Sequence, residues 1–235
     1  ASRGLGDVYK RQGQTASLVS TETSVPDLPT QSKTFIRSTE YLPFPADVQA
    51  AFQAAIDKEF STTTEKAGVS AAAYSNGMIW TYATGKADET ARMTAETPMF
   101  ISSTSKTFLS ALILTQIEKG LYKITDTLGV VLSSHPDLPS FDTDKINLDV
   151  TISDLLAMAS GLPNFNDNKA GVGEIFKQTS WKPSDNINLV QSPFIEPGTF
   201  DYNDTNVVLL GMVAEHHGDK SLATLYRETF FDPLG

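Results

Sequence analysis

Residues 100–108 read Phe-Ile-Ser-Ser-Thr-Ser-Lys-Thr-Phe, and this stretch decides how the sequence is interpreted. Ser103 and Lys106 lie three residues apart at the start of a predicted helix, Ser102–Glu118, so both side chains share one helix face. A serine hydroxyl becomes a nucleophile only when a base takes its proton, and a lysine amine can be that base if its charge is suppressed. The structural alternative is that the Ser and Thr side chains cap the helix and that Lys106 is a solvated first-turn residue. Ser-x-x-Lys is short enough to arise by chance, so by itself it leaves both interpretations open.

The rest of the sequence predicts an early β-hairpin followed by a long helical stretch. Apolar residues recur every four positions over Ala46–Phe60, which predicts a helix. Gly68–Ser75 and Met78–Thr84 flank Asn76-Gly77, a dipeptide that supplies the two positive-φ residues of a tight hairpin turn. Because strands and helices do not alternate, as they would in a parallel α/β protein, we expect an antiparallel sheet with a helical subdomain. Further helices are expected over residues 126–132, 150–159, 171–178, 184–191 and 204–216.

Composition narrows the classes of function. The chain has 235 residues, with 18 basic and 28 acidic side chains and hence a formal charge of −10. An acidic chain repels nucleic acids and anionic membranes, so neither is an expected partner. The absence of cysteine excludes disulfides, thiolate catalysis and cysteine-ligated zinc. No run of about 18 apolar residues occurs, so no membrane-spanning segment is predicted, and no metal-binding spacing of His, Asp and Glu is present.

Several further stretches follow residues 100–108 in order. They are Gly120–Asp126, Thr151–Leu156, Ser160-Gly161-Leu162-Pro163, Pro197–Asn206, Leu209-Leu210-Gly211 and Phe231–Gly235. Together with residues 100–108, this series resembles the serine β-lactamase-related family, which includes class C β-lactamases, D-alanyl-D-alanine carboxypeptidases and family VIII esterases. The resemblance extends from about Ala46 to Gly235.

The resemblance implies a fold and a mechanism. The fold would be α/β (α+β), the β-lactamase/transpeptidase-like arrangement of an antiparallel sheet flanked by helices with a helical subdomain. The mechanism would be acyl transfer, in which Ser103 attacks a carbonyl, Lys106 and Tyr202 handle the proton, and water hydrolyses the acyl-serine. No cofactor is expected. The substrate would be a β-lactam, a D-Ala-D-Ala peptide or a small ester, and the sequence does not choose among them or indicate an oligomeric state.

One position departs from the pattern of the family. In the family's second motif, Tyr-x-Asn, Tyr202 matches the tyrosine, but the third position is Asp204 instead of Asn. A carboxylate beside Lys106 would favour the lysine cation and so oppose its use as a base. Asp204 could be turned away or protonated, Lys106 could stay charged while Tyr202 acts as the base alone, or the protein could be slow or inactive. The last alternative would make it a silent family member that acts as a binding or scaffold protein.

Other residues that invite a functional interpretation are assigned to structure. Tyr74-Ser75-Asn76 also spells Tyr-x-Asn, but it precedes the nucleophile and falls on the predicted hairpin turn. The histidines are weak candidates, since a Ser-His-Asp triad needs one near Ser103; His216 and His217 end a predicted helix, where a partial positive charge suits the dipole. Trp80 and Trp181 are interpreted as packing residues.

The ends of the chain are interpreted separately. Residues 7–12 read Asp-Val-Tyr-Lys-Arg-Gln, which resembles the translated end of a sequencing-library transposon, so residues 1–12 are taken as a sequencing-adaptor artefact. Residues 13–45 begin with a Ser-, Thr-, Gln- and Pro-rich stretch and are expected to form a flexible leader. Residues 46–235 would be the N-terminal two-thirds of the hydrolase domain. Since family members are often extracytoplasmic, a periplasmic or secreted protein is expected, although no signal peptide is visible.

The third motif of the family, Lys-Thr-Gly or His-x-Gly, has no match in the chain. The resemblance implies that its strand supplies one donor of the oxyanion hole, the other being the N–H of Ser103. Loss of one such donor costs about 10²–10³ in rate. We therefore expect this fragment, lacking the C-terminal third, to be poorly stable and nearly inactive alone.

Overall fold

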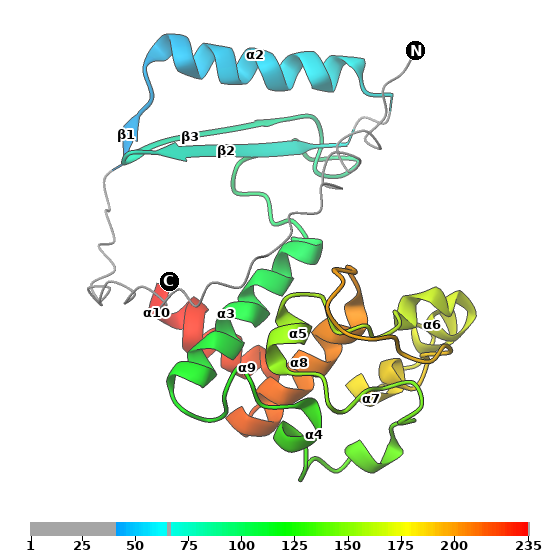
Figure 1. Ribbon diagram of the computed structural model, residues 1–235. Helices are drawn as coiled ribbons and strands as arrows, with labels where there is room; N and C mark the ends of the chain where they lie inside the picture. The colour runs from blue at the N-terminus through cyan, green and yellow to red at the C-terminus, as the bar shows by residue number, and fades with distance from the viewer. Residues whose placement is uncertain (1–40, 65–66, 235) are drawn as a thin grey trace. The chain divides into compact units, whose positions relative to one another are not determined.

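The computed structural model describes residues 41–64 and 67–234 (Figure 1). The chain divides into two compact units, one ending at Pro98 and the other beginning at Met99. Residues 1–12 and nearly all of the expected leader lie outside the described residues. Within the part that is described, no helix is both long and apolar enough to cross a membrane.

The first unit is a small sheet with one helix along it. Strand β2, Val69–Ser75, pairs antiparallel with β3, Met78–Thr84, which confirms the predicted hairpin. Strand β1, Leu42–Pro43, pairs in parallel with β3 and gives the order β1-β3-β2. Helix α2, Ala46–Thr62, matches the predicted helix and runs beside the strands (Figure 1). In this part of the chain β2 is an edge strand.

Aromatic side chains hold α2 to the sheet. The Phe52 ring lies 5.3 Å from that of Trp80, which in turn stacks on Tyr82 at 5.8 Å between centroids. The Tyr82 hydroxyl donates a hydrogen bond of 2.7 Å to Asp57 on α2. Trp80 is buried in this layer, so its interpretation as a packing residue is confirmed.

The start of the first unit differs from the expected leader up to residue 45. Leu42–Pro43 form β1, and the amide of Leu42 donates to the carbonyl of Gly77 at 3.0 Å. Phe44 is buried against Phe52, with 5.4 Å between ring centroids. A buried aromatic and a backbone pairing therefore fix these residues, although the local sequence has no strand-like alternation.

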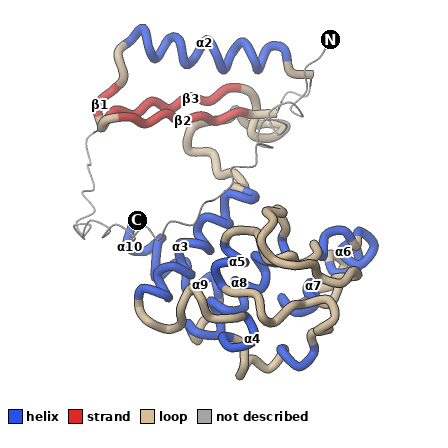
Figure 2. Tube along the Cα trace, viewed as in Figure 1, coloured by secondary structure: helices blue, strands red, loops and turns tan. Residues whose placement is uncertain are grey.

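The second unit is helical, with long connecting loops (Figure 2). Each of the expected helices after Ser102 is present, most of them shorter than predicted. The elements are η1 Ser102–Thr104, α3 Ser105–Glu118, α4 Leu128–Val131, η2 Leu138–Ser140, α5 Ile152–Leu156, η3 Phe165–Asp167, α6 Lys169–Ile175, α7 Pro183–Ile187, α8 Asp204–Gly218, α9 Leu222–Tyr226, η4 Arg227–Phe231 and α10 Asp232–Leu234.

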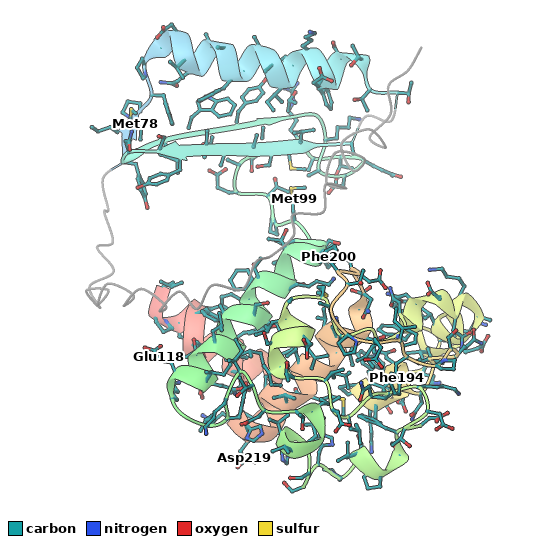
Figure 3. The ribbon with its side chains drawn as sticks, viewed as in Figure 1. Met78, Met99, Glu118, Phe194, Phe200 and Asp219 are labelled. Atoms are coloured by element: carbon teal, nitrogen blue, oxygen red, sulfur yellow. The ribbon has the colours of Figure 1, made fainter. Side chains whose placement is uncertain are left out.

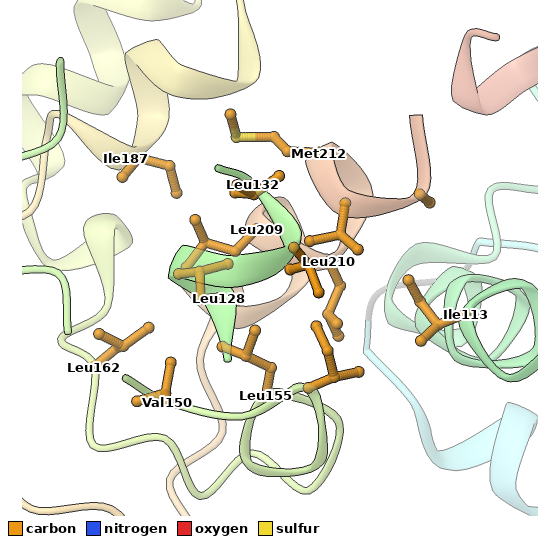
Figure 4. Close-up of a cluster of buried hydrophobic side chains, with 14 of the residues drawn as sticks. Ile113, Leu128, Leu132, Val150, Leu155, Leu162, Ile187, Leu209, Leu210 and Met212 are labelled. Carbon is orange, nitrogen blue, oxygen red and sulfur yellow. The ribbon is translucent and has the colours of Figure 1, made fainter. Parts of the chain in front are cut away.

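Helices α3 and α8 form the centre of this unit. Their apolar side chains meet in one core, where Ile113 from α3 and Leu209 from α8 are fully buried (Figure 4). Shorter helices contribute Leu128, Leu155 and Ile187 to the same cluster. Truncation of one such leucine to alanine costs about 2–5 kcal/mol, because the cavity it leaves is only partly filled.

A buried glutamine also joins the two central helices. Gln116 Nε2 on α3 donates a hydrogen bond of 2.9 Å to the carbonyl of Ala214 on α8. Gln116 Oε1 accepts a hydrogen bond of 2.7 Å from the Tyr122 hydroxyl. Because an unpaired buried polar group costs about 1–3 kcal/mol, this pairing fixes α8 against α3. Glu118 and Asp219, labelled in Figure 3, mark where the two helices end. Both begin at the opposite side of the unit, where the candidate site lies.

Candidate active site

Ser103 lies in a tight turn directly before α3. Ser102 has a φ of +46°, in the left-handed region, and opens the 3₁₀ turn η1. A non-glycine residue pays about 1–2 kcal/mol for that conformation. No side chain caps η1 or α3 at its N-cap residue, so the capping interpretation of this Ser/Thr stretch is wrong. The hydroxyl of Ser103 is thereby left to interact with other side chains.

Lys106 reaches Ser103 from the first turn of α3. Its Nζ donates a hydrogen bond of 3.1 Å to Ser103 Oγ, as the three-residue spacing on a helix predicts. The Lys106 side chain is only 19% exposed. It is therefore not the solvated first-turn residue of the structural alternative.

Tyr202 and Asp204 lie on either side of Asn203, at the start of the other central helix, α8. Asn203 is the N-cap of α8, and its side chain accepts the amide of Asn206. The cap places Asp204 at the first helical position and Tyr202 just outside the helix. Lys106 Nζ lies 5.0 Å from the centre of the Tyr202 ring, and both Lys106 and Ser103 are near enough to the Tyr202 hydroxyl to lower its pKa. The starts of α3 and α8 thus bring all four predicted site residues together.

The Asp204 carboxylate is directed at Lys106. Its Oδ1 lies 2.8 Å from Lys106 Nζ, and its Oδ2 accepts a hydrogen bond of 2.5 Å from Asn166 Nδ2. The alternative in which Asp204 is turned away is therefore wrong. Both partners are hydrogen-bond donors, so each oxygen of the carboxylate accepts one contact.

The contacts among these side chains shift the pKa values of Lys106 and Tyr202 in opposite directions. Burial alone lowers the pKa of Lys106, but its hydrogen bonds to Asp204 and Tyr202 and the charge of Asp204 outweigh burial, and the pKa is raised. Hydrogen bonds from Lys106 and with Ser103 lower the pKa of the Tyr202 hydroxyl. Lys106 is thus held as a cation, and Tyr202 loses its proton more easily than an ordinary tyrosine.

A second segment, Ser160–Asn166, supports the start of α8 through a series of hydrogen bonds. Asn203 Nδ2 donates to the carbonyl of Leu162 at 2.8 Å, and the Thr205 hydroxyl donates to that of Pro163 at 2.7 Å. The amide of Phe165 donates to Thr205 Oγ1, and the Ser160 hydroxyl to Asn206 Oδ1. The Ser-Gly-Leu-Pro motif therefore positions the second motif and has no contact of its own with Ser103 among these bonds.

A protein-family model covers most of the chain, including the site. This model, described as Beta-lactamase, matches residues 53–235. The chain belongs to the beta-lactamase family. The match includes Ser103, Lys106, Tyr202 and Asp204, and the predicted family resemblance is confirmed.

Solved structures with the same fold agree with this membership in the beta-lactamase family. The D-amino acid amidase of Ochrobactrum anthropi SV3 in complex with D-phenylalanine has a TM-score of 0.66 and 23% identity, with 81% of this chain and 51% of that one covered. The octameric penicillin-binding protein homologue of Pyrococcus abyssi has a TM-score of 0.62 and 20% identity, covering 82% and 43%. EstCE1, a hydrolase with promiscuous acyltransferase activity, has a TM-score of 0.64 and 23% identity, covering 80% and 52%.

These likenesses establish the fold of the beta-lactamase-family chain, and the predicted fold class is confirmed. The chain spans about half the length of the solved structures that it matches. A comparison with curated proteins gave no match. The comparisons therefore assign the chain to a family of hydrolases that share one fold.

An apolar hollow of about 390 Å³ adjoins Lys106 in this beta-lactamase-family site. Leu109 from α3, Val207 and Val208 from α8 and Tyr226 from α9 line it. Trp181 lies at the same hollow and is 54% exposed, so its interpretation as a packing residue is wrong. Phe200, also exposed, lies near the start of α3 (Figure 3).

The residues assigned to structure lie elsewhere. Asn76 and Gly77 have φ values of +48° and +76° and form the predicted hairpin turn, so Tyr74-Ser75-Asn76 belongs to the first unit. His216 and His217 lie in the last turn of α8, at the opposite end from Asp204, and the His135 ring is 5.4 Å from that of His216. No group of three or more His, Cys, Asp or Glu in the described ranges could hold a metal ion.

The sequence interpretation missed Asn166, which contacts Asp204. It lies in η3, three residues after the Ser-Gly-Leu-Pro motif. Its neighbours Asn164, Asp167 and Asn168 are typical of a polar loop, so composition does not single it out. Only the fold brings it to the start of α8.

Proposed function

We propose that this chain carries the acylating residues of a serine hydrolase, with Ser103 as the nucleophile. The observation that carries the proposal is the hydrogen bond of 3.1 Å that Lys106 Nζ donates to Ser103 Oγ, with the Tyr202 ring centre 5.0 Å from the same Nζ. A nucleophile must lie close to the groups that handle its proton, and this arrangement supports such a role for Ser103.

In the proposed mechanism Tyr202, and not Lys106, takes the proton of Ser103. A charged lysine has no lone pair for a proton, and Asp204 favours the charged form. The Lys106 cation instead stabilises the phenolate of Tyr202, whose lowered pKa supports this role. Proton transfer to a positioned base of this kind contributes about 10²–10⁴ in rate.

Acylation combines a proton transfer with an exchange of bonds at the substrate carbonyl carbon. The Ser103 O–H proton passes to the Tyr202 phenolate while Oγ forms a bond to the substrate carbonyl carbon. The bond from that carbon to the leaving group breaks, and the leaving group takes the proton back from Tyr202. A water molecule repeats the sequence on the acyl-serine and releases the acid. The N–H of Ser103, at the start of a helix where amides lack intrahelical acceptors, is the donor we assign to the oxyanion.

The substrate classes proposed are a β-lactam, a D-Ala-D-Ala peptide or a small ester. Amides of D-amino acids join them as assay substrates, because a D-amino acid amidase and a D-stereospecific amidohydrolase share the fold. The apolar hollow beside Lys106 favours substrates with an apolar side group. These proposals concern the whole protein, since the chain spans about half of its solved relatives.

The experiment is intact-mass measurement after incubation with a penicillin, on this chain and on any longer gene product that contains it. Ser103→Ala tests the nucleophile, and Ser110→Ala, farther along the same helix, is the matched control. We expect a mass increase equal to the β-lactam in the longer gene product and in its Ser110→Ala variant, none in its Ser103→Ala variant, and little in this chain alone. Ester hydrolysis that depends on Ser103 without a β-lactam adduct would assign the esterase branch.

A second candidate function has one observation in its favour. Asp204 replaces the Asn of the family motif and pairs with Lys106, which suits a silent family member that binds a ligand or acts as a scaffold. Such a protein would form no adduct and hydrolyse neither ester nor D-amino acid amide. That result, with the chain folded by circular dichroism, would refute the hydrolase proposal.

A further inference from the structure

The Asp204 carboxylate is held from two sides. Oδ1 pairs with Lys106 Nζ at 2.8 Å, and Oδ2 accepts the amide of Asn166 at 2.5 Å. Asn166 does not contact Ser103 or Tyr202 in any of its hydrogen bonds. Its link to the site passes through Asp204 alone.

We propose that Asn166 is a positioning residue that keeps the Asp204 carboxylate aimed at Lys106 and so decides that Tyr202, rather than Lys106, receives the proton of Ser103. This inference rests on the proposed serine hydrolase function for its chemical consequence. Its physical content, the control of the charge of Lys106, can be measured without turnover.

The surroundings hold Asn166 firmly enough for that role. The side chain of Asn164 caps η3 by accepting the amide of Asn166 at 3.1 Å. The preceding residue, Phe165, is buried, and its amide donates to Thr205 Oγ1 at 3.0 Å. Both anchors lie within two residues of Asn166, and one of them ends on the residue after Asp204. The distance between Asn166 and Asp204 is thus fixed by the backbone on both sides.

The bond between Asn166 and Asp204 is not needed to start α8. That task belongs to Asn203, which is buried and whose side chain caps the helix and binds the Leu162 carbonyl. An acidic residue in the first turn is already favoured by the helix dipole. The additional amide contact therefore acts on the orientation of the carboxylate. The Asp204 side chain is 30% exposed, so without Asn166 its Oδ2 could turn to water and Oδ1 would leave Lys106.

The test is an NMR titration of Lys106 in the full chain labelled with ¹³C-lysine, with the Lys106 signal assigned by its loss in Lys106→Arg. We expect Asp204→Asn and Asn166→Ala each to lower the pKa of Lys106, by about half a unit or more, since an opposite charge in contact shifts a pKa by about 1–3 units. The double variant should match Asp204→Asn alone, because two residues that act as one unit are not additive. Asn166→Ser, which keeps a shorter donor, should fall between the parent and Asn166→Ala.

Asn168→Ala is the matched control. Asn168 caps α6 by accepting the Gly171 amide and donates to the Leu189 carbonyl, so its loss weakens the same segment without touching Asp204. We expect it to leave the pKa of Lys106 unchanged. An unchanged pKa in both Asn166 variants, or a further decrease when Asn166→Ala is added to Asp204→Asn, would overturn the proposal.

The same variants separate this inference from the proposed function. If penicillin or ester acylates Ser103, the alkaline limb of the rate profile should move to lower pH in Asn166→Ala and not in Asn168→Ala. If no variant is acylated, the proposed function fails, and the titration still decides whether Asn166 controls Lys106. A titration without a shift in an active enzyme would remove the positioning role and keep the hydrolase.

Discussion

At the scale of residues, the proposed mechanism depends on which group beside Ser103 is deprotonated and can act as the base. In a site without a carboxylate, burial would lower the pKa of Lys106 and favour it as the base. Here the contact with Asp204 reverses that effect and raises the pKa of Lys106, while the pKa of Tyr202 is lowered. In the mechanism that we propose, Asp in place of Asn at position 204 therefore transfers the role of base from the amine of Lys106 to the phenol of Tyr202.

Tyr202→Phe tests this assignment. Loss of the phenol removes the proposed base, so we expect acylation to slow by about 10²–10⁴. In the parent, the reactive form has Tyr202 deprotonated, so the rate should rise with pH and reach half of its maximum below pH 10, the ordinary pKa of tyrosine. Stopped-flow measurement of acylation against pH checks both expectations. Tyr74→Phe, on the exposed hairpin, is the control, and equal rates in the two variants would exclude Tyr202 as the base.

At the scale of elements, the structure gives a physical reason for the Ser-Gly-Leu-Pro motif in the supporting segment Ser160–Asn166. Gly161 has a φ of +70°, and a Cβ built on it would lie 2.2 Å from the carbonyl oxygen of Ile195. The Ile195 amide donates to the Gly161 carbonyl at 3.0 Å, so neither backbone can move away. Only glycine fits both the conformation and the contact.

Gly161→Ala should therefore destabilise the chain by about 2 kcal/mol or more, through strain at positive φ and the clash with Ile195. Gly173→Ala, within α6 where an added Cβ meets nothing within 4 Å, should be neutral or stabilise by up to about 1 kcal/mol. Urea unfolding of both variants measures the difference. Equal midpoints would show that the backbone at Gly161 relaxes at little cost.

The sequence predicted elements whose signals are local. The hairpin turn at Asn76-Gly77 and the long helix ending at Glu118 follow from residues adjacent in the chain. The candidate site residues were located by motifs that occur in a fixed order along the sequence. The helix expected over residues 150–159 is shorter, since Met158 takes a φ of +53° after α5. Strand β1 and Asn166 have partners 36 and 38 residues away in the chain, and no local sequence pattern encodes such pairings.

At the scale of the whole molecule, all three histidines of the chain gather at the end of α8 that is remote from Ser103. The His216 ring lies 5.4 Å from that of His135 and 5.2 Å from that of His217. Ser134 Oγ lies 3.0 Å from His216 Nε2, and the His217 ring nitrogen lies 2.8 Å from the Val131 carbonyl oxygen. The helix dipole favours a positive charge here, but burial first, and then the neighbouring His217 and His135, lower the pKa of His216. At His216, burial and the neighbouring imidazoles therefore outweigh the helix dipole, which favours the charged form.

The pH dependence of stability follows from that lowered pKa. In the unfolded chain His216 takes up a proton near its ordinary pKa of 6.5, whereas in the folded chain it does so only at lower pH. The unfolded state therefore binds more protons between these two values, and stability decreases as pH falls from 6.5 through the folded pKa. The lowered pKa of Asp142, beside Lys145, acts in the same direction but below pH 3.8. The two contributions occupy separate pH windows.

His216→Gln should remove most of the loss near pH 6 and leave the acid loss below pH 4. Urea midpoints at pH 7.5, 6.5 and 5.5 would measure the first window, and a glutamine keeps a polar group near Ser134. Asp142→Asn is the complementary control, because it should change only the acid window. A midpoint that falls equally between pH 7.5 and 5.5 in the parent and in His216→Gln would contradict the assignment to His216.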